Sequence, residues 1–265
     1  MAKERLDVLV VNRGLAGSRE RARSLIMEGR IFVDGVREDK PGTKFDPERI
    51  REIVRHGEDM PYVSRGGYKL EKALEVFGLD PQGAVCMDVG ASTGGFTDVL
   101  LQHGAVRVYA VDSGTNQLAW SLRSDERVVC MERTNFRYMT AADVPELMDM
   151  VTADVSFISL RKILPPARAL MKSGGYMVCL IKPQFEAGRD AVGKHGIVRD
   201  KAVHTEVIEK VCMAATDEGF VIRGLDYSPI KGTEGNIEYL LALGTEGEDI
   251  PTDISAVVER AHGEL

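Results

Sequence analysis

The chain has 265 residues, of which 44% are hydrophobic, so it can bury one or two ordinary cores without disulfides or a structural metal. Its four cysteines stand far apart in apolar runs, which predicts buried free thiols in a reducing compartment and no metal site. The net charge is -7. The sequence shows neither the apolar segment of a signal peptide nor the ~20 apolar residues of a membrane span. We therefore expect a cytoplasmic protein without a membrane partner.

Residues 1–60 predict a small α+β domain that is rich in turns. The pattern indicates a helix over residues 6–14 and a second helix over residues 18–29, with a serine as its N-cap and a glycine at its end. Asp34-Gly35 stands between two apolar runs, which is typical of a tight hairpin. Residues 50–54 are expected to form another strand.

A linker over residues 61–83 follows, with an expected helix from about residue 67 to residue 77. Beyond it, strands and helices alternate over residues 84–245, which predicts an α/β, Rossmann-like sheet covered on both faces. The seven strand candidates are residues 84–90, 106–112, 127–131, 148–154, 175–181, 219–228 and 236–243. The helix candidates are residues 95–103, 115–123, 160–172 and 200–218. No helix-sized segment separates the last two strands, so we expect the final strand to be antiparallel, followed by an acidic C-terminal tail over residues 246–265 with a helix at about 252–262.

A glycine-rich turn after the first strand of this sheet is the expected cofactor site. Glycine permits positive φ and lets a ligand approach the backbone, and ligands of open α/β sheets bind beyond the carboxyl ends of the strands. The spacing does not match G-x-G-x-x-G, which disfavours NAD and FAD; a turn without a ligand is the alternative. An aspartate at the end of the second strand is suited to accept hydrogen bonds from a ribose diol. The candidate cofactor residues are Asp88, Gly90, Ala91, Ser92, Thr93, Gly94, Gly95, Phe96 and Asp112.

Four charged residues stand where charge is costly unless it is paired. Asp154 ends the fourth strand, Lys182 ends the fifth, Glu238 lies within the last strand, and Lys69 lies on the linker helix. The alternative interpretation is that these are ordinary strand-end charges and that Glu238 pairs with a surface lysine. Because the carboxyl ends of parallel strands meet at one edge, we expect Asp154 and Lys182 to lie beside the glycine-rich turn.

This set resembles the Lys-Asp-Lys-Glu tetrad of the FtsJ-like group of ribose 2′-O-methyltransferases, and the whole chain is similar to the TlyA family, historically called haemolysin A-like proteins. The matching segments are Arg5 to Asp7, Ser18 to Ala22, Val63 to Leu70, Asp88 to Phe96, Asp154 to Ser159, Leu180 to Glu186 and Gly235 to Tyr239. The resemblance implies an S4-type RNA-binding domain, S-adenosylmethionine as cofactor, and methylation of a cytidine ribose in ribosomal RNA. It also implies that Asn135 and Phe136 hold the adenine. The alternative is that Asn135 is an ordinary turn residue and Phe136 an ordinary core residue. One departure is the glycine turn, where the group usually has a proline before its glycines.

The chemistry implied by the resemblance begins with removal of a proton from a ribose hydroxyl. A neutral amine at Lys182 can accept that proton as general base, and we expect Lys69 and partial burial to favour the neutral form. Asp154 and Glu238 are then expected to orient the two lysines and the hydroxyl. The reaction needs no metal.

Arginines concentrate in the first two helices, and guanidinium groups bind phosphates well. The first 69 residues hold 15 Lys and Arg against 12 Asp and Glu, a positive balance on an acidic chain. A solvated face is the alternative. The candidate RNA-binding residues are Arg5, Arg19, Arg21, Arg23, Arg30, Arg65 and Tyr68.

We expect ribosomal RNA or ribosomal subunits as partner, not DNA, and a monomeric protein. Residues 183–198 are expected to form a long loop that can cover the site. A catalytically inactive RNA-binding factor is one alternative function. Membrane lysis, which only the older family name suggests, is another.

Overall fold

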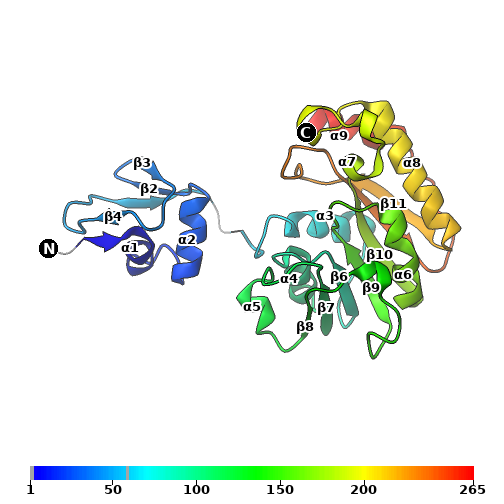
Figure 1. Ribbon diagram of the computed structural model, residues 1–265, viewed down its shortest axis with the longest axis horizontal. Helices are drawn as coiled ribbons and strands as arrows, with labels where there is room; N and C mark the ends of the chain where they lie inside the picture. The colour runs from blue at the N-terminus through cyan, green and yellow to red at the C-terminus, as the bar shows by residue number, and fades with distance from the viewer. Residues whose placement is uncertain (1–2, 58–59) are drawn as a thin grey trace. The chain divides into compact units, whose positions relative to one another are not determined.

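The computed structural model describes residues 3–57 and 60–265. The chain divides into two compact units, residues 1–59 and residues 60–265 (Figure 1). The first unit has one hydrophobic core, and the second has two, one on each face of its large sheet. Among the described residues, no helix combines the length and the apolarity that crossing a membrane requires.

The first unit packs two helices and a small antiparallel sheet around one core. Its elements are β1 (Glu4–Arg5), α1 (Leu6–Asn12), α2 (Arg19–Met27), β2 (Ile31–Val33), β3 (Val36–Glu38), β4 (Lys44–Phe45) and β5 (Ile53–Arg55). The order of the three-stranded sheet is β3-β2-β5, and β1 pairs with β4. Ser18 Oγ accepts a hydrogen bond from Arg21 N at 3.1 Å, which confirms the predicted N-cap.

The second unit is built on a seven-stranded sheet of order β11-β12-β10-β9-β6-β7-β8. Its strands are β6 (Val85–Val89), β7 (Arg107–Val111), β8 (Val128–Met131), β9 (Met148–Ala153), β10 (Met171–Ile181), β11 (Val221–Tyr227) and β12 (Tyr239–Gly244). Neighbouring strands from β10 to β8 are parallel, whereas β12 is antiparallel to both β10 and β11. The predicted α/β class, with an antiparallel final strand, is confirmed.

Helices cover both faces of this sheet (Figure 1). They are α3 (Gly67–Phe77), α4 (Gly95–Gln102), α5 (Trp120–Arg123), α6 (Leu164–Leu170), α7 (Pro183–Glu186), α8 (Lys201–Asp217) and α9 (Ile254–Glu264). Successive side chains of a strand point to opposite faces. Val178 and Leu180 of β10 therefore join the core beneath α3 and α4, whereas Met177 and Cys179 join the core beneath α6, α8 and α9.

Three predicted elements differ from those observed, in addition to β10, which begins at Met171 rather than at residue 175. The helix expected over residues 115–123 is reduced to α5. The helix expected over residues 160–172 is a 3-10 turn, Leu160–Lys162, followed by the short helix α6, which has a proline in its first turn and ends where β10 begins. In the first unit, a strand was expected over residues 50–54, whereas the observed strand β5 spans Ile53–Arg55.

Candidate active site

Four charged side chains lie at one edge of the sheet, and the reversed direction of β12 brings Glu238 there. Asp154 follows β9 and Lys182 follows β10, so both lie at the carboxyl edge of the parallel strands. Ile181 pairs with Tyr239. Glu238 was predicted to lie within the last strand, but it is the residue just before β12. Because β12 runs in the opposite sense, its beginning meets the ends of β9 and β10.

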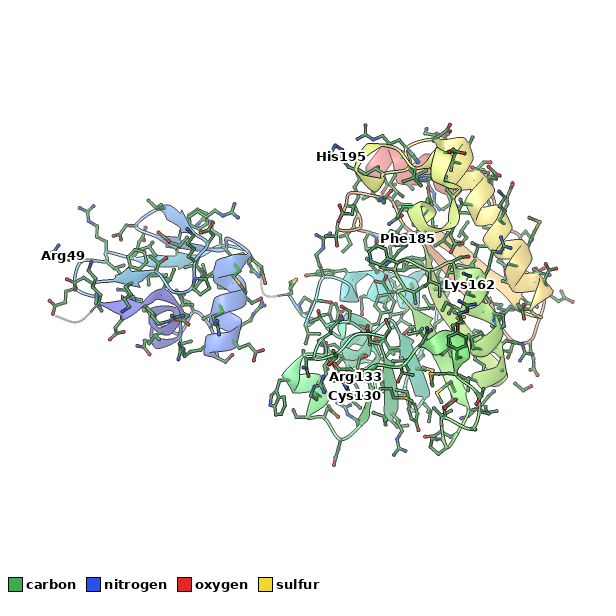
Figure 2. The ribbon with its side chains drawn as sticks, viewed as in Figure 1. Arg49, Cys130, Arg133, Lys162, Phe185 and His195 are labelled. Carbon is green, nitrogen blue, oxygen red and sulfur yellow. The ribbon has the colours of Figure 1, made fainter. Side chains whose placement is uncertain are left out.

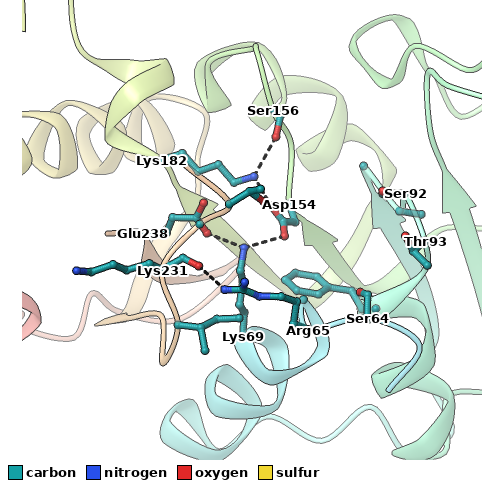
Figure 3. A pocket seen from close by; sticks show the side chains of 18 of the residues that line it. Ser64, Arg65, Lys69, Ser92, Thr93, Asp154, Ser156, Lys182, Lys231 and Glu238 are labelled. Carbon is teal, nitrogen blue, oxygen red and sulfur yellow. Dashed lines mark hydrogen bonds and ion pairs between the residues drawn. The ribbon is translucent and has the colours of Figure 1, made fainter. Parts of the chain in front are cut away.

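The four side chains point toward one another in a single cluster (Figure 3). Lys69 Nζ lies 2.6 Å from Glu238 Oε2 and 3.3 Å from Asp154 Oδ2. Lys182 Nζ lies 2.5 Å from Asp154 Oδ1 and donates a hydrogen bond to Ser156 Oγ at 3.1 Å. Lys69 and Lys182 are each 7% exposed and Glu238 is 2% exposed. The structure thus brings together the residues that the sequence placed apart, and adds Ser156.

Two lysines and two carboxylates balance each other's charge in this cluster. Burial lowers the pKa of Lys69, but the Asp154 and Glu238 carboxylates outweigh burial and raise that pKa above its ordinary value. Burial raises the pKa of Asp154, but the ammonium groups of Lys69 and Lys182 outweigh it and leave the pKa below the usual range. Asp154 is therefore an anion held between two amines, which offsets the cost of burying each charge.

The turn after β6 needs its glycines. Gly90 has φ +81°, and a Cβ there would lie 2.7 Å from the main-chain oxygen of Asp154. Gly94 has φ +99°, and a Cβ there would overlap the side chains of Leu118 and Leu122. Without a side chain, Gly90 lets the backbone pass close to the loop after β9, and Gly94 lets it pass close to Leu118 and Leu122.

Two aspartates predicted to bind the cofactor also support this turn. Asp88 is 1% exposed, and its Oδ2 accepts hydrogen bonds from Thr97 N at 2.9 Å and from Thr97 Oγ1 at 2.7 Å. Burial raises the pKa of Asp88 to about 7. Asp112 accepts hydrogen bonds from Ser92 N at 2.8 Å and from Gly114 N at 2.6 Å. Asp88 therefore anchors the first turn of α4, and Asp112 joins the loops after β6 and β7.

Two cavities open beside the turn and share part of their lining. One, of about 500 Å³, is lined by the four charged residues, by most of the turn, and by Arg65 and Lys231. The other, of about 470 Å³, is lined by Asp112, Asn135 and Phe136. Both volumes lie in the range of small-molecule sites. A carboxylate beside apolar Phe136 suits a nucleoside, whose ribose is polar and whose base is flat, so the chemistry of the second cavity fits the adenosyl part of S-adenosylmethionine.

Phe157 lies where the two cavities adjoin and lines both of them. Its backbone has φ +63°, its side chain is 91% exposed, and its ring centroid lies 5.1 Å from that of Phe185. A bulky residue at positive φ is strained, and such strain persists only where the surroundings impose it. This aromatic pair was not singled out from the sequence, because only the backbone angle and the exposure reveal it.

A buried polar network, also missed in the sequence, fixes the segment before α8 to the residues before β12. Asn236 is 1% exposed; its Oδ1 accepts from Val198 N at 3.0 Å and its Nδ2 donates to Gly196 O at 2.9 Å. His204 Nε2 lies 3.0 Å from Val198 O, and its Nδ1 lies 2.6 Å from Tyr239 Oη. Since a carbonyl can only accept, Nε2 carries the proton and Nδ1 accepts from the tyrosine.

The predicted RNA-binding residues do not share one environment. Asp7 is fully buried, and Arg5 Nε and Arg19 Nη2 lie 2.9 and 3.1 Å from its carboxylate. Hydrogen bonds from Arg5 lower the pKa of Asp7 to about 2. These two arginines therefore stabilise the first unit, whereas Arg23 is exposed and forms no ion pair with a described residue.

The remaining predicted RNA-binding residues also differ in their contacts. Arg21 lies 3.9 Å from Glu28, and Arg30 donates to His56 O at 3.0 Å. In the second unit, Arg65 lines the first cavity and donates to Lys231 O at 2.8 Å, and Tyr68 packs edge-on against Tyr62.

The model of the FtsJ-like methyltransferase family matches residues 62–245, and that of the S4 domain matches residues 4–50. The YqxC protein of Bacillus subtilis is 53% identical over 99% of this chain and 95% of its own length. The 16S/23S rRNA (cytidine-2'-O)-methyltransferase TlyA of Mycobacterium tuberculosis is 43% identical over 92% of this chain and 91% of its own length. The chain belongs to the TlyA family of FtsJ-like methyltransferases.

The fold of this FtsJ-like methyltransferase is also found among solved structures. One from Streptococcus thermophilus is 50% identical, with a TM-score of 0.78, and the match covers 100% of this chain and 97% of that one. The segment matched by the FtsJ-like family contains the glycine-rich turn, both cavities and all four clustered charges.

Proposed function

We propose that this protein transfers the methyl group of S-adenosylmethionine to the 2′-hydroxyl of a cytidine ribose in ribosomal RNA. The observation that carries the proposal is the buried cluster of Lys69, Asp154, Lys182 and Glu238 beside a cavity that suits a nucleoside. The substrate class comes from the TlyA relative, whose name states cytidine-2′-O methylation.

The first part of the proposal concerns the cofactor. Asp112 would accept hydrogen bonds from the ribose diol, Asn135 and Phe136 would hold the adenine, and the turn from Gly90 to Gly95 would lie along the amino-acid part. When bound, S-adenosylmethionine supplies a methyl group on a sulfonium, which is a good leaving group. The chain's own task is then to position the hydroxyl and to remove its proton.

The second part assigns the general base to Lys182. Lys69 contacts two carboxylates, whereas Lys182 contacts one carboxylate and the hydroxyl of Ser156. Lys182 therefore loses less electrostatic stabilisation than Lys69 when it becomes a neutral amine. After it accepts the proton from the ribose hydroxyl, Asp154 stabilises the resulting ammonium. Lys69 stays charged and keeps Asp154 and Glu238 in place.

The third part concerns the domains and RNA. We propose an S4-type RNA-binding domain over residues 1–60, a linker and helix over residues 61–83, and the methyltransferase domain over residues 84–245. The match of the S4 family to residues 4–50 and the exposed Arg23 support RNA binding by the first of these. Such a domain supplies affinity and placement, since folded RNA is recognised mainly by shape and backbone.

The test is transfer of tritium from methyl-labelled S-adenosylmethionine to separated small and large ribosomal subunits, followed by digestion to nucleosides. The expected product is 2′-O-methylcytidine. Lys182→Ala is expected to lower kcat by about 10²- to 10⁴-fold while S-adenosylhomocysteine still binds. Lys210→Ala, which removes a surface lysine paired with Glu206, is the control and is expected to be fully active. Label on a base or on protein contradicts the proposal. RNA binding without any transfer identifies an inactive RNA-binding factor instead.

A further inference from the structure

The lysines and arginines of the second unit differ in whether they form an ion pair with a carboxylate. Some surface cations lie within 4.0 Å of a carboxylate, as in the pairs Arg107–Glu146, Arg123–Glu132, Arg127–Asp125, Lys172–Asp149, Lys201–Glu259 and Lys210–Glu206. Among the described side chains of residues 60–265, in contrast, Arg65, Arg161 and Arg199 are exposed and form no ion pair, and the same holds for three residues beside the second cavity, Arg133, Arg137 and Lys162. We call these three residues the edge cations.

The edge cations lie on loops that flank the second cavity. Arg133 follows β8, and its N donates to the main-chain oxygen of Gly114 in the loop after β7. The next residues, Thr134 to Phe136, line the cavity, and Arg137 follows directly. Lys162, labelled in Figure 2, ends the 3-10 turn after β9. Its neighbour Ile163 lines the same cavity.

The order of strands in the sheet gives the approximate distance between the loops that carry the edge cations. The strands that precede Lys162 and Arg133, β9 and β8, are three positions apart in the sheet, with β6 and β7 between them. At the usual strand spacing this separation is roughly 14 Å. The cations therefore stand on both sides of the loops that carry Gly90 and Asp112, and a ligand that contacts all of them must be longer than a nucleoside.

Carboxylates at the same edge form no ion pair with the edge cations, because their oxygens are directed to other donors. Asp112 accepts hydrogen bonds from two main-chain N–H groups. Glu132 accepts from Gln117 N and pairs with Arg123 at 2.5 Å. Glu186 accepts from Leu160 N at 2.6 Å and from Ser159 Oγ at 2.7 Å. Their oxygens lie with these partners, so the edge cations are left to face solvent.

An exposed aromatic ring stands beside the edge cations. Tyr138 is 68% exposed, and the Arg137 guanidinium carbon lies 5.2 Å from its ring centroid. Exposed aromatic rings next to arginines are platforms on which single-stranded bases stack. S-adenosylmethionine does not account for this chemistry, because it carries one carboxylate and two positive groups. Unpaired cations with an aromatic ring suit a polyanion that carries flat bases.

We propose that the edge cations, together with Tyr138, bind the sugar-phosphate backbone of the RNA next to the ribose that is methylated. This inference rests on the proposed function and deepens it: RNA contacts the methyltransferase unit over its own charged surface, in addition to the S4 domain. The edge cations hold phosphates, and Tyr138 stacks on an unpaired base.

The test is the salt dependence of RNA binding by the full-length protein. The probe is 16S and 23S ribosomal RNA transcribed in vitro, which carries no methyl groups. The triple variant Arg133→Ala, Arg137→Ala, Lys162→Ala is compared with Arg127→Ala, Lys201→Ala, Lys210→Ala, which removes the same charge from residues paired elsewhere. Each lost phosphate contact reduces the slope of log Kobs against log salt by about 0.7 to 0.9, so the edge variant is expected to be shallower by about 2 to 3. The control is expected to keep the wild-type slope.

A second readout separates this surface from the cofactor site and from the proposed activity. The edge variant is expected to raise KM for RNA at least about tenfold, with kcat within about twofold and unchanged affinity for S-adenosylhomocysteine. Equal slopes for the edge variant and the control overturn the inference, as does a parallel loss of S-adenosylhomocysteine binding. If wild-type protein transfers no methyl group, the proposed function fails while the slopes still decide whether RNA binds here.

Discussion

Asp154 is the residue on which both lysines of the cluster converge. Each of its oxygens faces a different amine, Lys69 on one side and Lys182 on the other. A carboxylate in this position couples the two cations, because a proton lost from one amine strengthens the hold of Asp154 on the other. This coupling supports a division of roles in which Lys69 stays charged and Lys182 exchanges its proton.

Asp88 gives a pH-dependent prediction. Burial raises its pKa to about 7, above the ordinary value of 3.8, so the folded chain binds this proton more tightly than the unfolded chain. The contribution to stability is complete below about pH 4 and is lost as the pH rises through 7. In Asp88→Asn, the side chain keeps its size and shape but cannot ionise, so this loss of stability at high pH is absent. We expect the melting temperature of the variant, relative to wild type, to rise between pH 5 and pH 8.

The control for this prediction is Glu126→Gln, which neutralises an exposed acid on the same unit. Its melting temperature should follow that of the wild type at each pH. Parallel curves for Asp88→Asn and wild type would show that the buried carboxyl does not titrate in this range.

The arginines of the first unit divide into two kinds, which gives a second prediction. Arg19 binds the buried carboxylate of Asp7, whereas Arg23 is exposed. Arg19→Ala is expected to lower both the stability of the first unit and its affinity for ribosomal RNA, because it removes a partner of a buried charge. Arg23→Ala is expected to lower the affinity alone. Thermal melts and filter binding on both variants make the comparison, and equal melting losses contradict it.

At the scale of elements, the strand–turn–helix unit of β6 and α4 depends on Gly90. Gly90→Ala places a Cβ 2.7 Å from the main-chain oxygen of Asp154 in a backbone with φ +81°. We expect a loss of about 1–3 kcal/mol in stability and weaker binding of S-adenosylhomocysteine, measured by thermal melts and calorimetric titration. Gly263→Ala is the control, because a Cβ there meets nothing within 4 Å. A Gly90→Ala protein with wild-type ligand affinity would show that the turn adapts.

The segment that precedes α8 gives an element-scale prediction of its own. Asn236 joins it to the residues before β12 through Val198 N and Gly196 O. Asn236→Ala is expected to speed hydrogen exchange over residues 193–199 and to lower kcat more than the affinity for S-adenosylhomocysteine, because Glu238 lies two residues away. Residues 113–119 of the same protein serve as internal control. Unchanged exchange over residues 193–199 contradicts the proposed anchoring.

The sequence predicted those elements whose signals are local. The conformation of the apolar runs, of the glycine-rich turn and of the N-cap at Ser18 depends on a few neighbouring residues, and these features are found as predicted. The helix expected over residues 160–172 is divided at Ile163, because Pro165 and Pro166 have no N–H to continue the hydrogen bonds of the first turn, and it ends at Leu170 because β10 begins at Met171. Of the clustered charges, Asp154 and Lys182 were predicted from their positions at strand ends, whereas Glu238 was expected within the last strand and Lys69 on the linker helix. Ser156, Asn236 and the Arg–Asp7 contacts were missed, since only tertiary packing brings those partners together.

At the scale of the whole molecule, the cores of the two units share no residue, which predicts two unfolding transitions. The core of the first unit contains residues 6–53 only, and the cores of the second begin at Leu70. S-adenosylhomocysteine at about 100 times its Kd is expected to stabilise the second unit by about 2.7 kcal/mol and to leave the first unit unchanged. Asp7→Asn should lower only the first transition. Calorimetry distinguishes the two, and a single transition that shifts as a whole contradicts independent unfolding.

The direction of β12 constrains how chain length can vary among natural relatives. Strand β11 ends at Tyr227 and β12 begins at Tyr239, and the connection between them carries Lys231, Asn236 and Glu238. Adding one residue to the paired part would advance the carboxylate by about 3.3 Å and turn it to the opposite face of the sheet. Insertions are therefore expected to be tolerated in surface turns such as the one before α9, and to be selected against within β12.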